Sequence, residues 1–255
     1  MHTPAEAIER TEAFIAAHPQ GVISIVGPTG SGKTALSIAV GQALRSAAVI
    51  SIDSRQIYQQ LDVGTGKILP EEQRGLPHYG LSLLPVTKRW NAYTAQQYVL
   101  ERISALQQAG TTPVLCGGTM LWSDAVTEGY VFAERGEKSL ERQVPPFPVR
   151  KLITWWPREQ LYERINERCQ QMWAGGMLSE CAWLMTQPVV DKAVITSIGY
   201  AEGMAYLRGL STEHEARERF QQRSRHYAKR QLTWWRGRSD LEWVDMRGFS
   251  AKEKV

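Results

Sequence analysis

A glycine-rich octapeptide, residues 27–34, constrains the fold of this chain more than any other feature. Its sequence GPTGSGKT fits the pattern G-x-x-x-x-G-K-[ST], with an apolar run before it and a predicted helix that begins at Lys33. Its glycines permit backbone angles that turn successive N–H groups inward, and the start of the helix adds positive potential. Lys33 supplies a mobile positive charge, and the hydroxyl of Thr34 can ligate Mg²⁺. The loop is therefore predicted to hold a diphosphate group. The residues expected to contact it are Gly27, Thr29, Gly30, Ser31, Gly32, Lys33 and Thr34.

Buried-type strands alternate with helices through the first half of the chain. Strands are predicted at residues 21–26, 48–52, 113–116, 151–155 and 241–244, and helices at residues 4–17, 93–109 and 213–236. Such alternation is typical of a parallel sheet with helices packed on it. We therefore predict an α/β fold, a P-loop NTPase-like parallel sheet flanked by helices, with a mainly helical C-terminal part.

Three regions are expected along the chain. Residues 1–130 form the core, and residues 64–87 within it are rich in Gly and Pro and are predicted to be mostly loop. Residues 131–150 are polar and then proline-rich, so a connection is expected there. Residues 151–255 are expected to be mainly helical and to complete the core.

Composition narrows the class of protein. Hydrophobic residues make up 43% and charged residues 22%, as in an ordinary soluble globular protein. No apolar run approaches the roughly 20 residues of a membrane span, and the N-terminus does not resemble a signal peptide. Cys116, Cys169 and Cys181 show neither metal-ligand spacing nor a disulfide framework. A cytoplasmic protein without a membrane partner is therefore expected by default.

Basic residues gather near the C-terminus although the net charge is only +4. Between Arg217 and Arg238 there are eight Lys and Arg residues and a single acid, Glu218. Such a stretch indicates a polyanion partner, or else only a solvated helix face.

The position of the acidic residues bears on the reaction. NTPases with this loop usually place an Asp at the end of a later strand to hold the metal ion. Here the strand at 113–116 is followed by Gly-Gly-Thr119, without an acid, whereas Asp53 follows the strand at 48–52. This pattern argues against an NTPase and leaves a carboxylate free to act as a base.

With these pieces placed, the chain resembles the tRNA dimethylallyltransferases, which transfer a five-carbon allyl group to N6 of an adenine beside the anticodon. The matching segments keep the family's order and cover most of residues 21–236. They are residues 27–34, 53–58, 61–67, 77–78, 93–95, 117–119, 161–165, 198–200 and 224–234.

The resemblance implies roles for particular residues. An adenine N6 amine is a weak nucleophile, so the reaction needs an anion cradle for the departing diphosphate, a base, and exclusion of water. The resemblance makes Asp53 the base, although a turn carboxylate would look the same. It places Thr119 near the diphosphate or the attacked carbon, although a helix N-cap is the alternative. It also makes Arg225 a diphosphate ligand, through its forked donors.

The adenine and the tRNA are expected to be contacted by further residues that match the family. Gln56 is expected to read the adenine edge with its amide, with a surface amide as the alternative. The full predicted set is Ser54, Gln56, Thr65, Lys67, Gly199, Tyr200, Lys229, Arg230, Gln231 and Arg236. The pairs Trp155-Trp156 and Trp234-Trp235 are expected to pack in the interior rather than to form the wall of a prenyl tunnel.

The chain also departs from the family. A sizeable helical insertion normally follows the Gly-Gly-Thr helix, but only about 27 residues separate Gly129 from Pro157 here. Smaller changes are Met120, Trp122 and Ser224. The lost insertion leaves the acceptor open between tRNA, which is preferred, and free AMP, ADP or ATP. Mg²⁺, dimethylallyl diphosphate and a monomeric state are expected in either case. Two other functions remain as alternative hypotheses: a P-loop kinase that acts on small molecules, and a non-catalytic RNA-binding protein.

Overall fold

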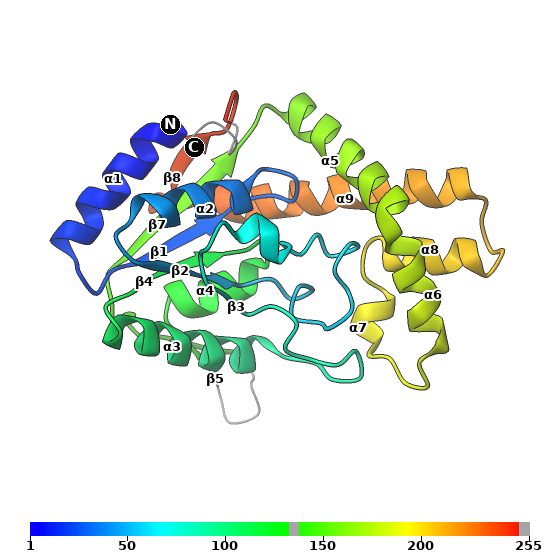
Figure 1. Cartoon of the computed structure of the whole chain (residues 1–255), viewed down its shortest axis with the longest axis horizontal. Helices are drawn as coiled ribbons and strands as arrows, with labels where there is room; N and C mark the ends of the chain where they lie inside the picture. The colour runs from blue at the N-terminus through cyan, green and yellow to red at the C-terminus, as the bar shows by residue number, and fades with distance from the viewer. Residues whose placement is uncertain (133–137, 250–255) are drawn as a thin grey trace.

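The computed structural model describes residues 1–132 and 138–249, which form a six-stranded parallel sheet with helices packed on it (Figure 1). The strands follow the order β3-β2-β4-β1-β7-β8, and every neighbouring pair is parallel. Their bounds are Val22–Val26 (β1), Ala47–Ser51 (β2), His78–Tyr79 (β3), Thr112–Cys116 (β4), Val149–Trp155 (β7) and Glu242–Asp245 (β8). The predicted α/β fold with a parallel sheet is confirmed.

The central strands are buried on both faces. All five residues of β1, of β2 and of β4 are buried, as expected when helices cover both sides of a parallel sheet. The predicted strands agree with the observed ones to within two residues at each end. β3 and the 3₁₀ helix η1 (Pro70–Gln73) lie within residues 64–87 and were missed. Both are too short to give a periodic signal.

Two pairs of helices cover the two faces of the sheet. They are α1 (Pro4–Ala17) with α2 (Lys33–Ala43), and α3 (Ala92–Gln108) with α4 (Met120–Thr127). Ile23 and Ile25 of β1 share an apolar cluster with residues of α1 and α2, whereas Val22 packs with α3 and α4. The split arises because successive side chains of a strand point to opposite faces.

The C-terminal half supplies β7, β8 and a second group of helices. These are α5 (Arg158–Met172), η2 (Trp173–Met177), α6 (Leu178–Thr186), α7 (Lys192–Ile195), α8 (Tyr200–Leu207) and α9 (Glu213–Arg236). Figure 1 shows α9 running from beside the sheet to the group formed by α6, α7 and α8. Leu161 and Ile165 of α5 pack in one apolar cluster with Ile57 and Leu61 of the N-terminal half. Among the described residues, no helix has both the length and the apolar character that crossing a bilayer requires.

A pair of strands at residues 130–132 and 138–142 is a feature that the sequence did not predict. β5 (Tyr130–Phe132) and β6 (Lys138–Arg142) pair as antiparallel strands, where only a polar connection was expected. Tyr130 is buried, and its carbonyl accepts a hydrogen bond from Gln96 Nε2 at 2.7 Å. This anchor joins residues 34 positions apart in sequence, so no local pattern reveals it.

Candidate active site

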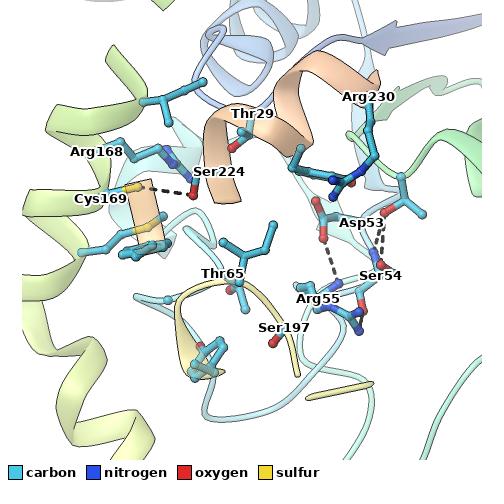
Figure 2. Close-up of a pocket in the computed structure, with 18 of the residues that line it drawn as sticks. Thr29, Asp53, Ser54, Arg55, Thr65, Arg168, Cys169, Ser197, Ser224 and Arg230 are labelled. Atoms are coloured by element: carbon cyan, nitrogen blue, oxygen red, sulfur yellow. Dashed lines mark hydrogen bonds between the residues drawn. The ribbon is translucent and has the colours of Figure 1, made fainter. Parts of the chain in front are cut away.

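Two cavities lie at the carboxyl ends of the central strands, where open α/β sheets usually bind ligands. The loop cavity, about 440 Å³, is lined by residues 29–35 and by α5. The helix cavity, about 450 Å³, is lined by α5, α8 and α9 and by the turns after β2 and β4 (Figure 2). Five residues line both cavities: Thr29, Asp53, Thr65, Arg168 and Tyr227. The two cavities therefore meet at a shared wall that contains Asp53.

The loop at residues 27–34 has the backbone that its glycines allow. Gly27, Gly30 and Gly32 have φ values of +150°, +75° and +88°, a region that favours glycine. A Cβ atom on Gly27 would also lie 2.2 Å from Thr154 Oγ1. α2 begins at Lys33, as predicted, so the N–H groups of its first turn have no partner within the helix. The loop is therefore built to bind an anion.

Lys33 and Thr34 lie where the sequence placed them, on the loop cavity. Lys33 Nζ donates a hydrogen bond to Pro28 O at 2.8 Å. Burial lowers the pKa of the Lys33 ammonium to about 8, and the negative charge of Asp53 opposes part of this shift. Thr34 is exposed, so its hydroxyl is accessible from solvent.

Ser31 and Gln231 support the loop instead of presenting free polar atoms to a ligand. The buried Ser31 hydroxyl donates to Pro28 O at 2.7 Å and lies 2.6 Å from the hydroxyl of Thr154. Buried Gln231 accepts the N–H of Thr29 at 2.8 Å and donates to Gly118 O at 2.8 Å. Both residues nevertheless line the loop cavity, and the predicted contacts of Ser31 with diphosphate and of Gln231 with tRNA stay predictions.

Asp53 and Thr119, the two residues with predicted catalytic roles, both line the helix cavity. Asp53 Oδ1 accepts the N–H of Arg55 at 2.8 Å beside the helix cavity (Figure 2). Asp53 is thus a turn carboxylate, and it also lines the loop cavity. Among the described residues, no donor binds its Oδ2. Thr119 occupies the N-cap position of α4, but its hydroxyl accepts the N–H of Ser54 at 3.0 Å instead of capping the helix. The turns after β2 and β4 are thereby joined beside Asp53.

Arg225 lies outside the linings of the two cavities, so its position does not support its predicted role as a diphosphate ligand, which stays a prediction. Its Nη1 donates to Asn166 Oδ1 of α5 at 2.6 Å, and it lines neither cavity. The helical repeat explains this position. Ser224 and Tyr227 of α9 face the helix cavity at i and i+3, and Arg225 is turned by about 100° from Ser224.

Arg168 of α5 occupies the shared wall instead, and the sequence analysis missed it. Burial lowers the pKa of its guanidinium, and Asp53 opposes this shift. Arg164, one turn earlier, also lines the loop cavity. The sequence did hold a signal for this pair, because Arg164 and Arg168 are four residues apart and residues i and i+4 lie on one face of a helix.

Lys67 and Gln56 are held by the protein itself. Lys67 Nζ donates to Tyr58 O, Asp62 Oδ1 and Ser82 Oγ at 2.7, 2.5 and 2.8 Å, which uses all three donors of a side chain only 6% exposed. These contacts do not support the predicted contact of Lys67 with tRNA, which stays a prediction. Gln56 lines the loop cavity, but its Oε1 accepts from Ser51 and its Nε2 donates to Gly66 O. The Gln56 amide therefore orders this turn. Its predicted contact with adenine stays a prediction.

Glu180 of α6 holds a turn of the core, and no sequence signal pointed to it. Its Oε1 accepts the N–H groups of Asp62 and Val63, both at 2.7 Å. Its Oε2 accepts the N–H of Gly64 at 3.0 Å and the hydroxyl of Tyr200 at 2.6 Å. The buried Tyr200, which lines the helix cavity, thus uses its hydroxyl within the protein, and its predicted contact with tRNA stays a prediction.

Gly199 serves packing, and Thr65 lies on the site. A Cβ atom on Gly199 would lie 3.1 Å from Met177 and from Phe220, and its φ of +92° favours glycine. The predicted contact of Gly199 with tRNA therefore has no support from its surroundings. The Thr65 hydroxyl donates to Leu61 O at 2.6 Å, and the residue lines both cavities. Its contact with adenine or tRNA stays a prediction.

The remaining predicted cations lie on the outer part of α9. Lys229, Arg230 and Arg236 are exposed, and Arg230 also lines the helix cavity, with its guanidinium 5.6 Å from the ring centre of Tyr227. Their contact with tRNA stays a prediction. None of Trp155, Trp156, Trp234 and Trp235 is among the described residues that line the two cavities.

Comparison with known proteins places these features in one family. The family model described as IPP transferase matches residues 56–144 and 131–238. A protein named tRNA dimethylallyltransferase from Streptococcus sanguinis (strain SK36) is 33% identical over 285 residues, covering 92% of this chain and 95% of that protein. The 285 aligned positions exceed the 255 residues here, so at least 30 positions of the alignment have no residue in this chain.

Solved structures agree with this family. A tRNA Δ(2)-isopentenylpyrophosphate transferase from Staphylococcus epidermidis has a TM-score of 0.81 and 27% identity, covering 91% of this chain and 94% of that chain. A full-length tRNA isopentenylpyrophosphate transferase from Bacillus halodurans has a TM-score of 0.79 and 28% identity, with coverages of 89% and 90%.

The contacts of Glu180 predict a specific loss of stability. We expect Glu180→Ala to lower the free energy of unfolding by about 2–4 kcal/mol, because it leaves three N–H groups and a buried hydroxyl without their acceptor. Urea denaturation measures this change. Glu163→Ala, an exposed position on α5, is the matched control and is expected to stay within about 0.5 kcal/mol. Equal effects of the two substitutions would contradict the role of Glu180.

Proposed function

The chain belongs to the IPP transferase family, and on this premise we propose that it transfers a dimethylallyl group from dimethylallyl diphosphate to N6 of an adenine beside the anticodon of tRNA. Diphosphate is the leaving group. The observation that carries this proposal is the shared wall, because Asp53 stands between a cavity built for an anion and a second cavity with a partly apolar lining.

The loop cavity suits the diphosphate. At one end of this cavity, the loop N–H groups and the start of α2 provide a site for an anion, and Lys33 adds a positive charge. Arg168 and Arg164 line the same cavity from α5. These groups stabilise the negative charge that builds up on diphosphate as its bond to the allylic carbon breaks.

The helix cavity suits the allyl chain and the adenine. Its apolar lining residues are Met120, Leu121, Ile165, Cys169, Met172, Ile198 and Phe220. Such a lining excludes water from a cation-like transition state, which water would otherwise capture. Its mouth also carries Arg230, whose charge favours an approaching polynucleotide.

Asp53 accounts for the fate of the proton. The N6 amine attacks the allylic carbon, the bond from that carbon to the diphosphate oxygen breaks, and the N6 proton passes to the Asp53 carboxylate. The N–H of Arg55 holds Oδ1 of this carboxylate in place, which leaves Oδ2 for the amine.

Magnesium fits this site as a partner of the bound diphosphate. Mg²⁺ usually binds one or two protein oxygens together with phosphate oxygens and water, so a cage of protein carboxylates is not required. Within the described residues no three His, Cys, Asp or Glu side chains cluster as a metal site. Thr34 and Asp53 provide oxygens on the loop cavity, and we assign the ion to Thr34 and the diphosphate.

The acceptor is proposed to be tRNA rather than a free adenine nucleotide. The relatives and structures that match nearly the whole chain are named as tRNA enzymes, and α9 presents Lys229, Arg230 and Arg236 to solvent. The two segments of the family match overlap at residues 131–144, where an insertion is expected to be missing. We propose that a monomeric chain acts in the cytoplasm and grips the anticodon stem less extensively than its longer relatives do.

An acceptor panel tests the proposed function. The protein is incubated with dimethylallyl diphosphate, Mg²⁺ and either unmodified tRNA, AMP or ATP, and digested nucleosides are analysed for N6-prenyl adenosine. Product is expected from tRNA. Asp53→Asn is expected to slow its formation by at least about 10²-fold while binding of inorganic diphosphate changes little.

The control for this panel is Glu101→Gln, an exposed position on α3, which is expected to keep full activity. Product from AMP or ATP but not from tRNA would reassign the acceptor. An active Asp53→Asn enzyme would remove Asp53 from the mechanism, and absence of product from every acceptor would defeat the proposal.

The lowered pKa of Lys33 predicts an alkaline limit for the reaction. The ammonium that attracts diphosphate is present below about pH 8 and is lost as the pH rises above that value. We therefore expect kcat/KM for dimethylallyl diphosphate to fall above about pH 8 in the free enzyme. Arginine keeps its charge at alkaline pH. The Lys33→Arg variant is therefore expected to react more slowly at every pH, but without the fall in kcat/KM above about pH 8. The same fall in Lys33→Arg would assign it to another group.

A further inference from the structure

Two side chains from the C-terminal half hold consecutive carbonyl groups of the loop. The indole N–H of Trp156 donates a hydrogen bond to Ser31 O at 3.0 Å. Arg164 Nε donates to Gly30 O at 3.1 Å. The guanidinium of Arg164 also lies 4.3 Å from the ring centre of Trp156, within the range of a cation–π contact. Trp156 therefore contacts the loop directly and also steadies the second donor.

The hydrogen bond of Trp156 fixes the direction of a neighbouring donor. A peptide unit is planar and trans, so its C=O and its N–H point in opposite directions. The carbonyl of Ser31 and the N–H of Gly32 belong to one such unit. Gly32 lines the loop cavity, whereas Trp156 is not among the described residues that line it. Holding the carbonyl from outside thus turns the N–H of Gly32 toward the cavity.

Within the part of the chain that the structure describes, no hydrogen bond joins the neighbouring Trp155 to the loop, which separates the role of Trp156 from general packing. Trp155 is also half-buried, and its ring lies 5.7 Å from the guanidinium of Arg247 near the chain end. Ser31 is fully buried, so its carbonyl would lose its donor and remain away from water if the indole N–H were removed. A buried carbonyl without a partner favours a rearranged loop.

We infer that Trp156, together with Arg164, is a positioning residue of the diphosphate site that sets the orientation of the Ser31–Gly32 peptide. The inference rests on the proposed function only for the identity of the diphosphate-bearing substrate. Trp156 touches neither the substrate nor the reacting atoms. It acts through the loop, and its removal is expected to weaken binding of the donor while leaving the tRNA side unchanged.

The substitution Trp156→Phe tests this inference, because phenylalanine keeps an aromatic face for Arg164 and removes the N–H donor. Binding of inorganic diphosphate with Mg²⁺ is measured by calorimetry on the full chain, and KM is measured for dimethylallyl diphosphate and for tRNA. We expect the dissociation constant of diphosphate and the donor KM to rise about 5- to 10-fold, as for one lost hydrogen bond. The KM for tRNA is expected to stay within about twofold.

Trp155→Phe is the matched control and is expected to leave all three constants within about twofold of the unmodified protein. Unchanged diphosphate binding in Trp156→Phe, or equal losses in both variants, would overturn the inference. If Trp156→Phe does not fold, hydrogen exchange of the Trp156 indole N–H in the unmodified protein decides instead. Diphosphate is expected to slow this exchange, and an unaltered rate would count against the role of Trp156.

Diphosphate binding needs no prenyl acceptor, so this test separates the inference from the proposed function. A protein that binds diphosphate through a loop oriented by Trp156, but prenylates no tRNA, would keep the inference and lose the function. A protein that prenylates tRNA with unchanged affinity in Trp156→Phe would keep the function and lose the inference.

Discussion

The buried amide of Gln231 is the contact on which the geometry of the site depends. It accepts the N–H of Thr29 after β1 and donates to the carbonyl of Gly118 after β4. Both ends of the amide are used, so α9 is fixed in rotation and in translation against the sheet. This register brings Ser224 and Tyr227 to the helix cavity and leaves Arg225 on another side of α9. The basic surface of α9 is oriented by the same contact.

The site also depends on a close approach between the turns after β2 and β4. A Cβ atom on Gly117 would lie 2.5 Å from Ile52 O, so only glycine allows these two turns to meet. The Thr119 hydroxyl then bonds to the N–H of Ser54, and Asp53 is held between the two cavities. The loop after β1 is thereby combined with Asp53, the proposed base, which follows β2 on the far side of β4. The helix cavity beside Asp53 has a partly apolar lining that suits an allyl group.

The sequence predicted the features that depend on local spacing. The glycine-rich loop, the start of α2 at Lys33, the buried strands and the position of Asp53 follow from periodicity and from a short motif. It could not show the hydrogen bonds that polar side chains make with distant partners. Lys67 was expected on tRNA but its three donors are used within the core. Gln231 bonds to Thr29, 202 positions away in sequence, and a matching motif cannot show which atoms are already used.

The central claim is that donor and acceptor meet at the shared wall beside Asp53. A crystal structure with a non-reactive thio-analogue of dimethylallyl diphosphate, Mg²⁺ and an anticodon stem-loop tests this claim most directly. The account predicts the diphosphate on the loop N–H groups beside Lys33, the allyl chain in the helix cavity, and the adenine N6 within about 3 Å of the Asp53 carboxylate. An adenine bound away from Asp53, or a diphosphate seated in the helix cavity, would contradict it.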